Sequence, residues 1–319
     1  DFIHRQSLAS SIRYTTLELA ELEKAIESAA SQVIALELSL FEDLIQTIQH
    51  HHQRLLRLAQ ALAGFDVASS LADIAIKHHY TRPILDGSLT FQLTQARHPV
   101  VEKALCDSSF IANDTYFDDQ KRFFLITGPN MAGKSTYLRQ KALVVILAQM
   151  GSFVPAQNAH IGIVDRIFSR VGAADDLSAG QSTFMVEMVE TATILHQATP
   201  RSLVILDEIG RGTATYDGLA IAWAVTEALY HTNKSRTLFA THYHELTQLK
   251  ETLSKLGCLT MRIQEEEGRV VFLHQVIKGS ADRSYVVHVA ALAGLPPTVI
   301  ARAEQLLDVF EKQSQSANK

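Results

Sequence analysis

The first part of the chain is patterned like a long helix that packs against another helix. Between Thr16 and Ala63 there is neither glycine nor proline, and the apolar seam recurs at alternating intervals of three and four residues. Its positions are Leu19, Leu22, Ile26, Ala29, Val33, Leu36, Leu40, Leu44, Ile48, His51, Leu55, Leu58 and Leu62. Successive intervals of four around Leu40–Ile48 form a stutter. The pattern predicts either one long helix or a helix broken near the stutter, and it fits both a rigid arm and a plain helical bundle.

Turn-forming residues follow this region. We expect Gly64 to end the long helical stretch and residues 65–80 to form a further helix. Arg82-Pro83 and Asp86-Gly87 then mark turns. The sequence therefore predicts a helical segment over residues 1–80, before a domain of different texture over residues 81–296.

From about Thr90 onward, short apolar runs alternate with helical patterns. Three runs are typical of strands, and a helical pattern follows each of them: 122–127 then 134–149, 202–207 then 216–231, and 236–241 then 245–249. This alternation favours an α/β domain with a mainly parallel sheet. A later strand at 269–276 is expected to pair with 259–264, and a last helix is expected at 297–312 before a polar tail.

The composition of the chain argues against several classes of protein. The 319 residues carry a formal net charge of −5, which argues against a chain whose main surface grips nucleic-acid phosphates. With two cysteines, neither a disulfide framework nor a cysteine-rich zinc site is expected. The longest apolar run, 142–148, is far shorter than the about 20 residues of a membrane span. Because Asp1 is no initiator methionine and no signal-peptide layout follows it, we expect a fragment of a cytoplasmic protein without a membrane partner.

The octapeptide GPNMAGKS, 128–135, fits the pattern of a phosphate-binding loop, G-x-x-x-x-G-K-[ST], between an apolar strand and a helical pattern. Its glycines let backbone N–H groups wrap a phosphate. Lys134 is expected to reach the β- and γ-phosphates of ATP, and Ser135 to bind Mg²⁺. The expected nucleotide-binding residues of this segment are Gly128, Pro129, Asn130, Met131, Ala132, Gly133, Lys134, Ser135 and Thr136.

Two other strand ends complete the expected chemistry. Asp207 closes an apolar run and is expected to hold Mg²⁺ directly or through water, and Glu208 to orient the attacking water. Consecutive acidic residues favour a hydrolase over a small-molecule kinase, because a kinase has no water to activate. His242 ends the third run and is placed to contact a γ-phosphate. The motifs predict a Mg²⁺-dependent ATP hydrolase with Lys134, Glu208 and His242 in catalytic roles.

The order of these motifs resembles that of the ABC-type ATPases. The segments TGPNMAGKST, GQSTFMVEM, DEIGRGT with YDG, and ATHY together closely resemble the MutS family of DNA mismatch repair ATPases. ARHPVVE, 96–102, is similar to that family's entry into the ATPase domain, and 289–303 to its C-terminal dimerisation helices. The resemblance implies an ABC-type P-loop ATPase domain, preceded by a long-helix, all-α lever and ending in a dimerisation segment and tail at 297–319.

The resemblance also assigns roles to single residues. Phe110 matches the aromatic side chain that stacks on adenine, and Ile111 the neighbour whose backbone reads the base. Asn130 and His274 match family residues near the nucleotide, and Ser182 matches a signature residue that faces the ATP of a partner subunit. The resemblance thus implies a homodimer with composite ATP sites that switch a mismatch-recognition clamp and signal to a MutL-like partner.

The chain departs from the family pattern at three points. Ala214 stands where serine is frequent, and Val286 where glycine is usual, which puts the local backbone there in doubt. None of the 14 phenylalanines is followed two positions on by glutamate, so the family's Phe-x-Glu mismatch-reading wedge is absent. Mismatched double-stranded DNA is therefore expected to bind through domains that this chain lacks.

Three other classes of nucleotide-binding protein fit the sequence less well. A transporter ATPase needs the standard Leu-Ser-Gly-Gly-Gln signature, which 175–188 lacks. A chromosome-organising ATPase carries long coiled coils between its two motifs, whereas Lys134 and Asp207 are only 73 positions apart. A scaffold that binds nucleotide without hydrolysing it is disfavoured by the intact Lys134, Asp207 and Glu208, and a turnover assay separates it from an enzyme.

Overall fold

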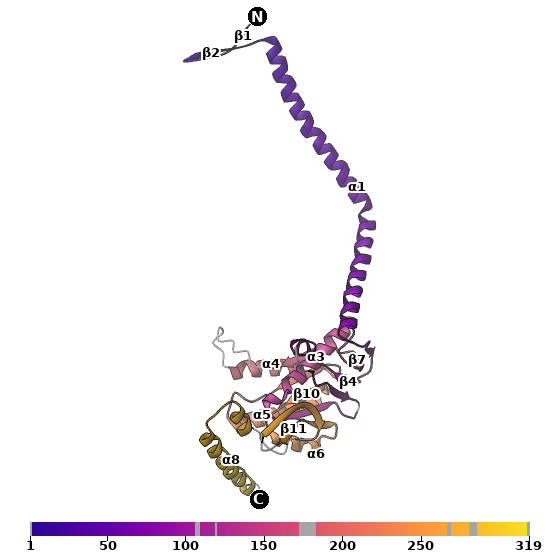
Figure 1. The fold of residues 1–319 in the computed structure, drawn as a ribbon. Coiled ribbons are helices and arrows are strands. Elements are labelled where there is room, and N and C mark those ends of the chain that lie inside the picture. Colours follow the sequence, from indigo (N-terminus) through magenta and orange to yellow (C-terminus); the bar gives the residue numbers. More distant parts are fainter. Residues whose placement is uncertain are drawn as a thin grey trace. The chain divides into compact units, whose positions relative to one another are not determined.

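The structure is a computed structural model that describes residues 2–105, 109–118, 120–171, 183–266, 269–280 and 286–317 (Figure 1). The chain forms two compact units, residues 1–70 and 71–319. The first unit begins with an antiparallel hairpin of β1 (Ile3–Leu8) and β2 (Ser11–Thr15), which the sequence did not predict. The 61-residue helix α1 (Leu17–Lys77) follows the hairpin.

Helix α1 corrects the expectation that Gly64 ends the helical region and that 65–80 is a separate helix. It runs without interruption through both Gly64 and the stutter. A glycine inside a helix costs only about 0.5–1 kcal/mol relative to alanine, and the many helical hydrogen bonds on either side outweigh that cost. The predicted segment boundaries at residues 80 and 296 stay predictions.

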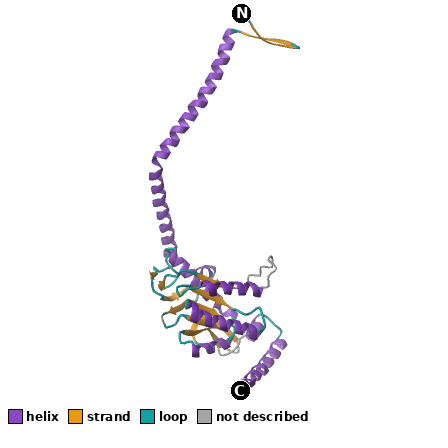
Figure 2. Cartoon of the chain, turned by 180° about the vertical axis from the view of Figure 1, so that it is seen from behind, coloured by secondary structure: helices purple, strands orange, loops and turns teal. Residues whose placement is uncertain are grey.

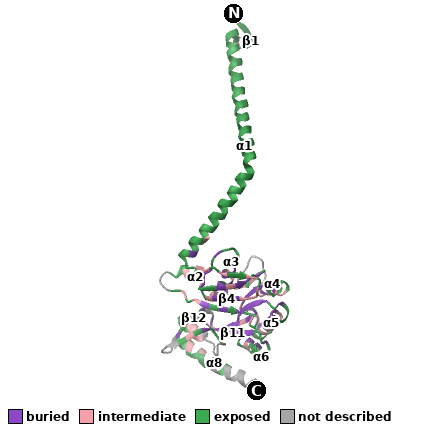
Figure 3. Cartoon of the chain, turned by 90° about the vertical axis from the view of Figure 1, so that its right-hand side faces the viewer, coloured by how far each residue is buried: buried purple, intermediate pink, exposed green. Residues whose placement is uncertain are grey.

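The apolar seam of α1 is exposed along the helix (Figure 3). Leu22, Leu36 and Leu58 are 59%, 62% and 56% exposed. Among the described residues, α1 is also the one helix whose length and composition would allow it to cross a membrane, a test that core helices of soluble proteins pass as well. The heptad spacing of the seam is the spacing of a helix that packs against other helices.

The second unit is built on a six-stranded sheet in the order β12-β11-β6-β10-β9-β8. Its strands are β6 (Phe123–Thr127), β8 (Ile167–Arg170), β9 (Leu203–Asp207), β10 (Arg236–Ala240), β11 (Leu256–Glu266) and β12 (Arg269–Lys278). All neighbouring pairs are parallel except the hairpin of β11 and β12. The mainly parallel sheet and the late hairpin confirm the sequence prediction.

Buried side chains alternate between the two faces of this sheet, so each face has its own core. Figure 2 shows the strands of this unit in orange, with helices in purple around them. Ile126 and Ile205 face a core shared with α3 (Lys134–Gln149), whereas Leu125 and Leu206 face a core shared with α4 (Thr183–Gln197) and α5 (Thr215–Ala228). Along the chain, α5 is followed by a π-helical turn (Leu229–Asn233) and then by β10. After β10 come the 3-10 helix η4 (His244–Gln248) and α6 (Leu249–Thr252).

A second sheet has the order β3-β7-β4-β5 and contributes Phe91, Phe117 and Ile161 to the core on the α3 face. Its strands are β3 (Ile84–Asp86), β4 (Phe91–Ala96), β5 (Asn113–Phe117) and β7 (Asn158–Gly162), with α2 (Pro99–Ala104) after β4. The chain closes with α7 (Val286–Leu292) and α8 (Pro297–Ala317). The expected end of the last helix at Lys312 was wrong, because the residues after it include neither glycine nor proline and continue the helix.

Candidate functional site

The glycine-rich loop leaves β6 and turns directly into α3. Gly128 and Gly133 have φ of +120° and +100°, a backbone conformation that side-chain-bearing residues rarely adopt. Between them, Pro129 precedes the short 3-10 helix η1 (Asn130–Ala132), and Lys134 begins α3. The loop therefore points the first N–H groups of a 16-residue helix toward the carboxyl edge of the sheet, a position where anions bind.

Four of the predicted side chains meet at this edge. The ammonium of Lys134 is buried, donates to the carbonyl of Gly128, and lies 4.0 Å from Oε1 of Glu208. The hydroxyl of Ser135 donates to Oδ2 of Asp207 across 2.6 Å. The structure thus brings residues from β6, α3 and β9 together as the motifs predicted, although they are far apart in sequence.

Glu208 is held by both its backbone and its carboxylate. It has φ of +57°, a left-handed conformation that is uncommon for a residue with a side chain. Its N–H donates to the carbonyl of Ala240 at 2.9 Å, and its Oε2 accepts from Arg211 at 2.8 Å. Backbone strain of this kind persists only where the surroundings enforce it, and it is concentrated at functional sites.

Burial shifts the protonation equilibria of this cluster. Desolvation lowers the pKa of Lys134, and the nearby Glu208 and Asp207 carboxylates oppose the shift. Desolvation raises the pKa of Asp207, against the hydrogen bond from Ser135. The pKa of His242 is lowered, again mainly by burial, with Glu208 opposing and Lys134 contributing. His242 therefore belongs to the same electrostatic cluster as the lysine and the glutamate.

A cavity of about 480 Å³ lies beside the loop. Seven of the predicted nucleotide-binding residues line it: Phe110, Ile111, Met131, Gly133, Ser135, Thr136 and His274. The Nδ1 atom of His274 lies 3.0 Å from the carbonyl of Ala132, and the Asn113 side chain donates to the carbonyl of His274 at 3.0 Å. These bonds fix β12 against the glycine-rich loop and β5, so one wall of the cavity is preformed.

Some predicted residues cannot be judged or were overlooked. Ser182 lies outside the described residues, and of Asn130 only the backbone is described. The cavity is also lined by Asn113, Tyr137 and Gln140, which were not predicted as nucleotide-binding residues. Tyr137 and Gln140 follow the loop on α3 at helical spacing and could have been found from that spacing; Asn113 carries no comparable signal.

Among the described residues, no three histidine, cysteine, aspartate or glutamate side chains cluster as a metal site. Ser135 and Asp207 nevertheless offer a hydroxyl and a carboxylate oxygen within hydrogen-bonding distance of each other. Hard oxygen ligands in this small number suit Mg²⁺, which keeps several waters and is completed by substrate phosphates. The residues therefore fit the metal that the motifs predict.

Comparison with known proteins identifies the family to which the chain belongs. The model of MutS domain V matches residues 124–311. Two curated DNA mismatch repair proteins MutS, from the Gardel and Welgevonden strains of Ehrlichia ruminantium, are each 53% identical over 308 residues. That match covers 97% of this chain but 38% of each relative's length. The chain, with its glycine-rich loop, its Asp207-Glu208 strand end and its adjoining cavity, belongs to the MutS family of DNA mismatch repair proteins.

Proposed function

We propose that this chain is the ATP-hydrolysing part of a mismatch repair protein, and that its loop and cavity bind ATP. The observation that carries the proposal is the convergence of Lys134, the Ser135–Asp207 pair and Glu208 beside a cavity lined by Phe110 and His274. The cavity offers an aromatic side chain for a base. The lysine and the start of α3 offer positive charge for phosphates.

The chemistry would be phosphoryl transfer to water, in which positioning and electrostatic stabilisation do most of the catalysis. Lys134 would neutralise charge on the β- and γ-phosphates, and Glu208 would orient the attacking water. His242 would contact the γ-phosphate. Ser135 and Asp207 would hold Mg²⁺, which would supply positive charge against the charge that develops on the phosphate.

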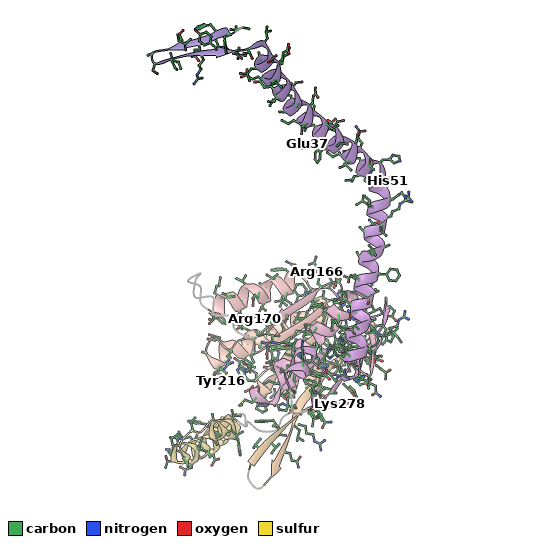
Figure 4. The ribbon with its side chains drawn as sticks, turned by 45° about the horizontal axis from the view of Figure 1, so that its top comes forward. Glu37, His51, Arg166, Arg170, Tyr216 and Lys278 are labelled. Atoms are coloured by element: carbon green, nitrogen blue, oxygen red, sulfur yellow. The ribbon has the colours of Figure 1, made fainter. Side chains whose placement is uncertain are left out.

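The site is proposed to be completed by a second copy of the chain. Exposed apolar side chains lie on the two helices nearest the Glu208 loop: Met185 and Val189 one turn apart on α4, and Tyr216 at the start of α5. Tyr216 is labelled in Figure 4. Tyr216 is 85% exposed, and a large aromatic side chain left in water near a site favours a partner surface. Ser182, just before α4, would then face the partner's ATP, with Arg211 and Asp217 at the interface.

In the whole protein, ATP binding and hydrolysis would switch a clamp between mismatch recognition and signalling to a MutL-like partner in the cytoplasm, with α1 as part of a lever. Mismatched DNA would be bound by parts of the protein outside this chain. This larger cycle rests on family membership and on the exposed seam of α1, whose spacing calls for helical partners.

The proposal is tested by ATP binding and turnover in the purified chain. Lys134→Ala should weaken ATP binding strongly with the fold retained, because it removes the buried cation beside the loop. Glu208→Ala should bind ATP near normally yet lose turnover by at least about 100-fold, as expected when a group acts only in the transition state. Lys255→Ala, a change at an exposed lysine before β11, serves as the matched control.

Two outcomes would contradict the proposal. Unchanged ATP affinity in Lys134→Ala would remove the phosphate assignment of the loop. Tight binding without turnover in the unaltered chain would favour a nucleotide-gated scaffold over an enzyme.

A further inference from the structure

The backbone of one residue, Gly210, is bonded both to α4, a helix that the proposed mechanism does not use, and to the tyrosine beside His242. Gly210 follows Glu208 by two positions and has φ of +88°. Its N–H donates to Oε1 of Glu187 on α4 at 2.6 Å, and its carbonyl accepts from the hydroxyl of Tyr243 at 2.9 Å. Both hydrogen bonds are buried. We call Glu187, Gly210 and Tyr243 the Gly210 clamp.

The clamp is tightly packed. A Cβ atom added to Gly218 would lie 2.2 Å from both the Gly210 carbonyl and the Tyr243 hydroxyl, so only a glycine fits at that point of α5. A Cβ at Gly212 would meet the Cβ of Phe184, on α4, at 3.1 Å. The loop after Glu208 is therefore closely packed against the start of α4 at Gly212 and against the first turn of α5 at Gly218.

The clamp also connects the loop that carries Glu208 with the residues that follow β10. The N–H of Glu208 is bonded to Ala240 at the end of β10, and Ile209 is fully buried. Gly210 is then held at its N–H and at its carbonyl, which belong to successive peptide groups. The ring of Tyr243 also contacts the ring of His242, with centroids 4.0 Å apart and a tilt of 40° between the planes. One tyrosine thus contacts both the loop that carries Glu208 and the ring of His242.

Helix α4 is in turn fixed to the edge of the sheet. Arg170, at the end of β8, pairs with Glu190 of α4 through Nε and Oε2 at 2.8 Å (Figure 4). Glu187 lies one turn earlier on the same helix and is 7% exposed. A carboxylate is expensive to bury unless it accepts strong hydrogen bonds, and a short bond from a backbone N–H is of that kind.

We propose that Glu187 and Tyr243 are positioning residues of the hydrolytic site, which hold Gly210 and thereby set the Glu208 carboxylate and the His242 ring relative to Lys134. The inference rests on the proposed ATPase function and deepens it. A displacement of α4 by a partner subunit would be passed to the Glu208 carboxylate through the backbone of Gly210.

The test compares variants that remove single atoms, in the full chain, by steady-state ATP turnover and by ATP binding at equilibrium. Tyr243→Phe should lower kcat by about 10-fold or more, because small displacements of catalytic groups are costly, while the dissociation constant for ATP stays within about twofold. Tyr230→Phe is the matched control: its hydroxyl accepts from the N–H of Lys255 at 3.0 Å, away from Glu208. It should leave kcat unchanged.

Glu187 supplies the second variant pair. Glu187→Gln keeps an acceptor oxygen and should retain more activity than Glu187→Ala, which a purely electrostatic role for the carboxylate would not give. The effects of Tyr243→Phe and Glu187→Ala should combine to less than their product, since both act through the backbone of the same residue, Gly210.

Three results separate the possibilities. If Tyr243→Phe and Tyr230→Phe have the same kcat, or if the loss in Tyr243→Phe is in ATP affinity instead of kcat, the clamp is only structural and the inference is overturned while the ATPase proposal stands. If the unaltered chain binds ATP but shows no turnover, the proposed function fails first and the inference with it.

Discussion

Helix α1 and the sheet of the second unit contain the same apolar residue types, but these side chains are exposed on α1 and buried in the sheet. Leu36 of α1 is 62% exposed. Leu125 is fully buried, and it lies on β6, a strand that pairs with β10 on one side and β11 on the other. The strand places its leucine in a core that the same unit completes. The helix repeats leucine at heptad spacing and finds no partner for it in its own unit. Apolar spacing thus predicts an element and its apolar face, but not where the partner of that face comes from.

The largest expected effect tests this difference in burial. Leu125→Ala should lower the free energy of unfolding of the α/β unit by about 2–5 kcal/mol, the cost of a cavity in a packed core. Leu36→Ala should change it by less than about 0.5 kcal/mol, as for an exposed position. Urea unfolding followed by the fluorescence of Trp223, the single tryptophan, on α5, reports on this unit alone. Equal effects would show that α1 is packed in solution.

A glycine pair sharpens the comparison. Gly64→Ala should stabilise α1 by about 0.5–1 kcal/mol, because a Cβ at that position meets nothing within 4 Å and alanine restricts the unfolded chain. Gly218→Ala should destabilise the α/β unit by about 1–3 kcal/mol, since the added Cβ overlaps the Gly210 carbonyl and the Tyr243 hydroxyl. Circular dichroism follows the helix and Trp223 fluorescence the unit. A neutral Gly218→Ala would mean that the backbone contact at Gly210 is loose.

The smallest expected effect is a pH dependence confined to the second unit. Burial lowers the pKa of His98 and of His242 below the ordinary 6.5, so the unfolded chain takes up protons first as the pH falls. Stability should therefore decline as the pH drops below about 6.5. His242→Gln should flatten this decline and the double change with His98→Gln should flatten it further, with all three slopes equal between pH 7.5 and 8.5. An unchanged slope below pH 6.5 in the double variant would contradict the assigned cause.

The sequence predicted best where one local rule decided the structure. The runs that became β6, β9 and β10 are continuous and apolar because those strands are buried on both faces. The glycine-rich loop was predictable because its φ values need glycine at two fixed positions and its strand and helix lie beside it. The position of Lys134 opposite Glu208 followed, since parallel strands end at one edge of a sheet.

Other features depended on contacts that no local pattern encodes. The strands FQLTQA (β4) and NDTYF (β5) mix polar with apolar residues, so the second sheet was not predicted as a unit. The continuity of α1 through Gly64 depends on the balance of many helical bonds against one glycine. The Gly210 clamp joins residues from α4, the loop after β9 and the segment between β10 and η4, and its bonds to the backbone of Gly210 leave no trace in the spacing of side chains.

The hydrogen bond between Asn113 and His274 can form only late in the synthesis of the chain. The two residues are 161 positions apart, and at about 5–20 residues per second His274 is added roughly 8–32 s after Asn113. Phe110 and Ile111 have left the peptidyl-transferase centre when that interval begins, and the glycine-rich loop, 128–135, is added early in it, while the wall of the cavity on β12 does not yet exist. A nascent chain can therefore form the loop early but can enclose a nucleotide only after the last hairpin of the sheet has been made.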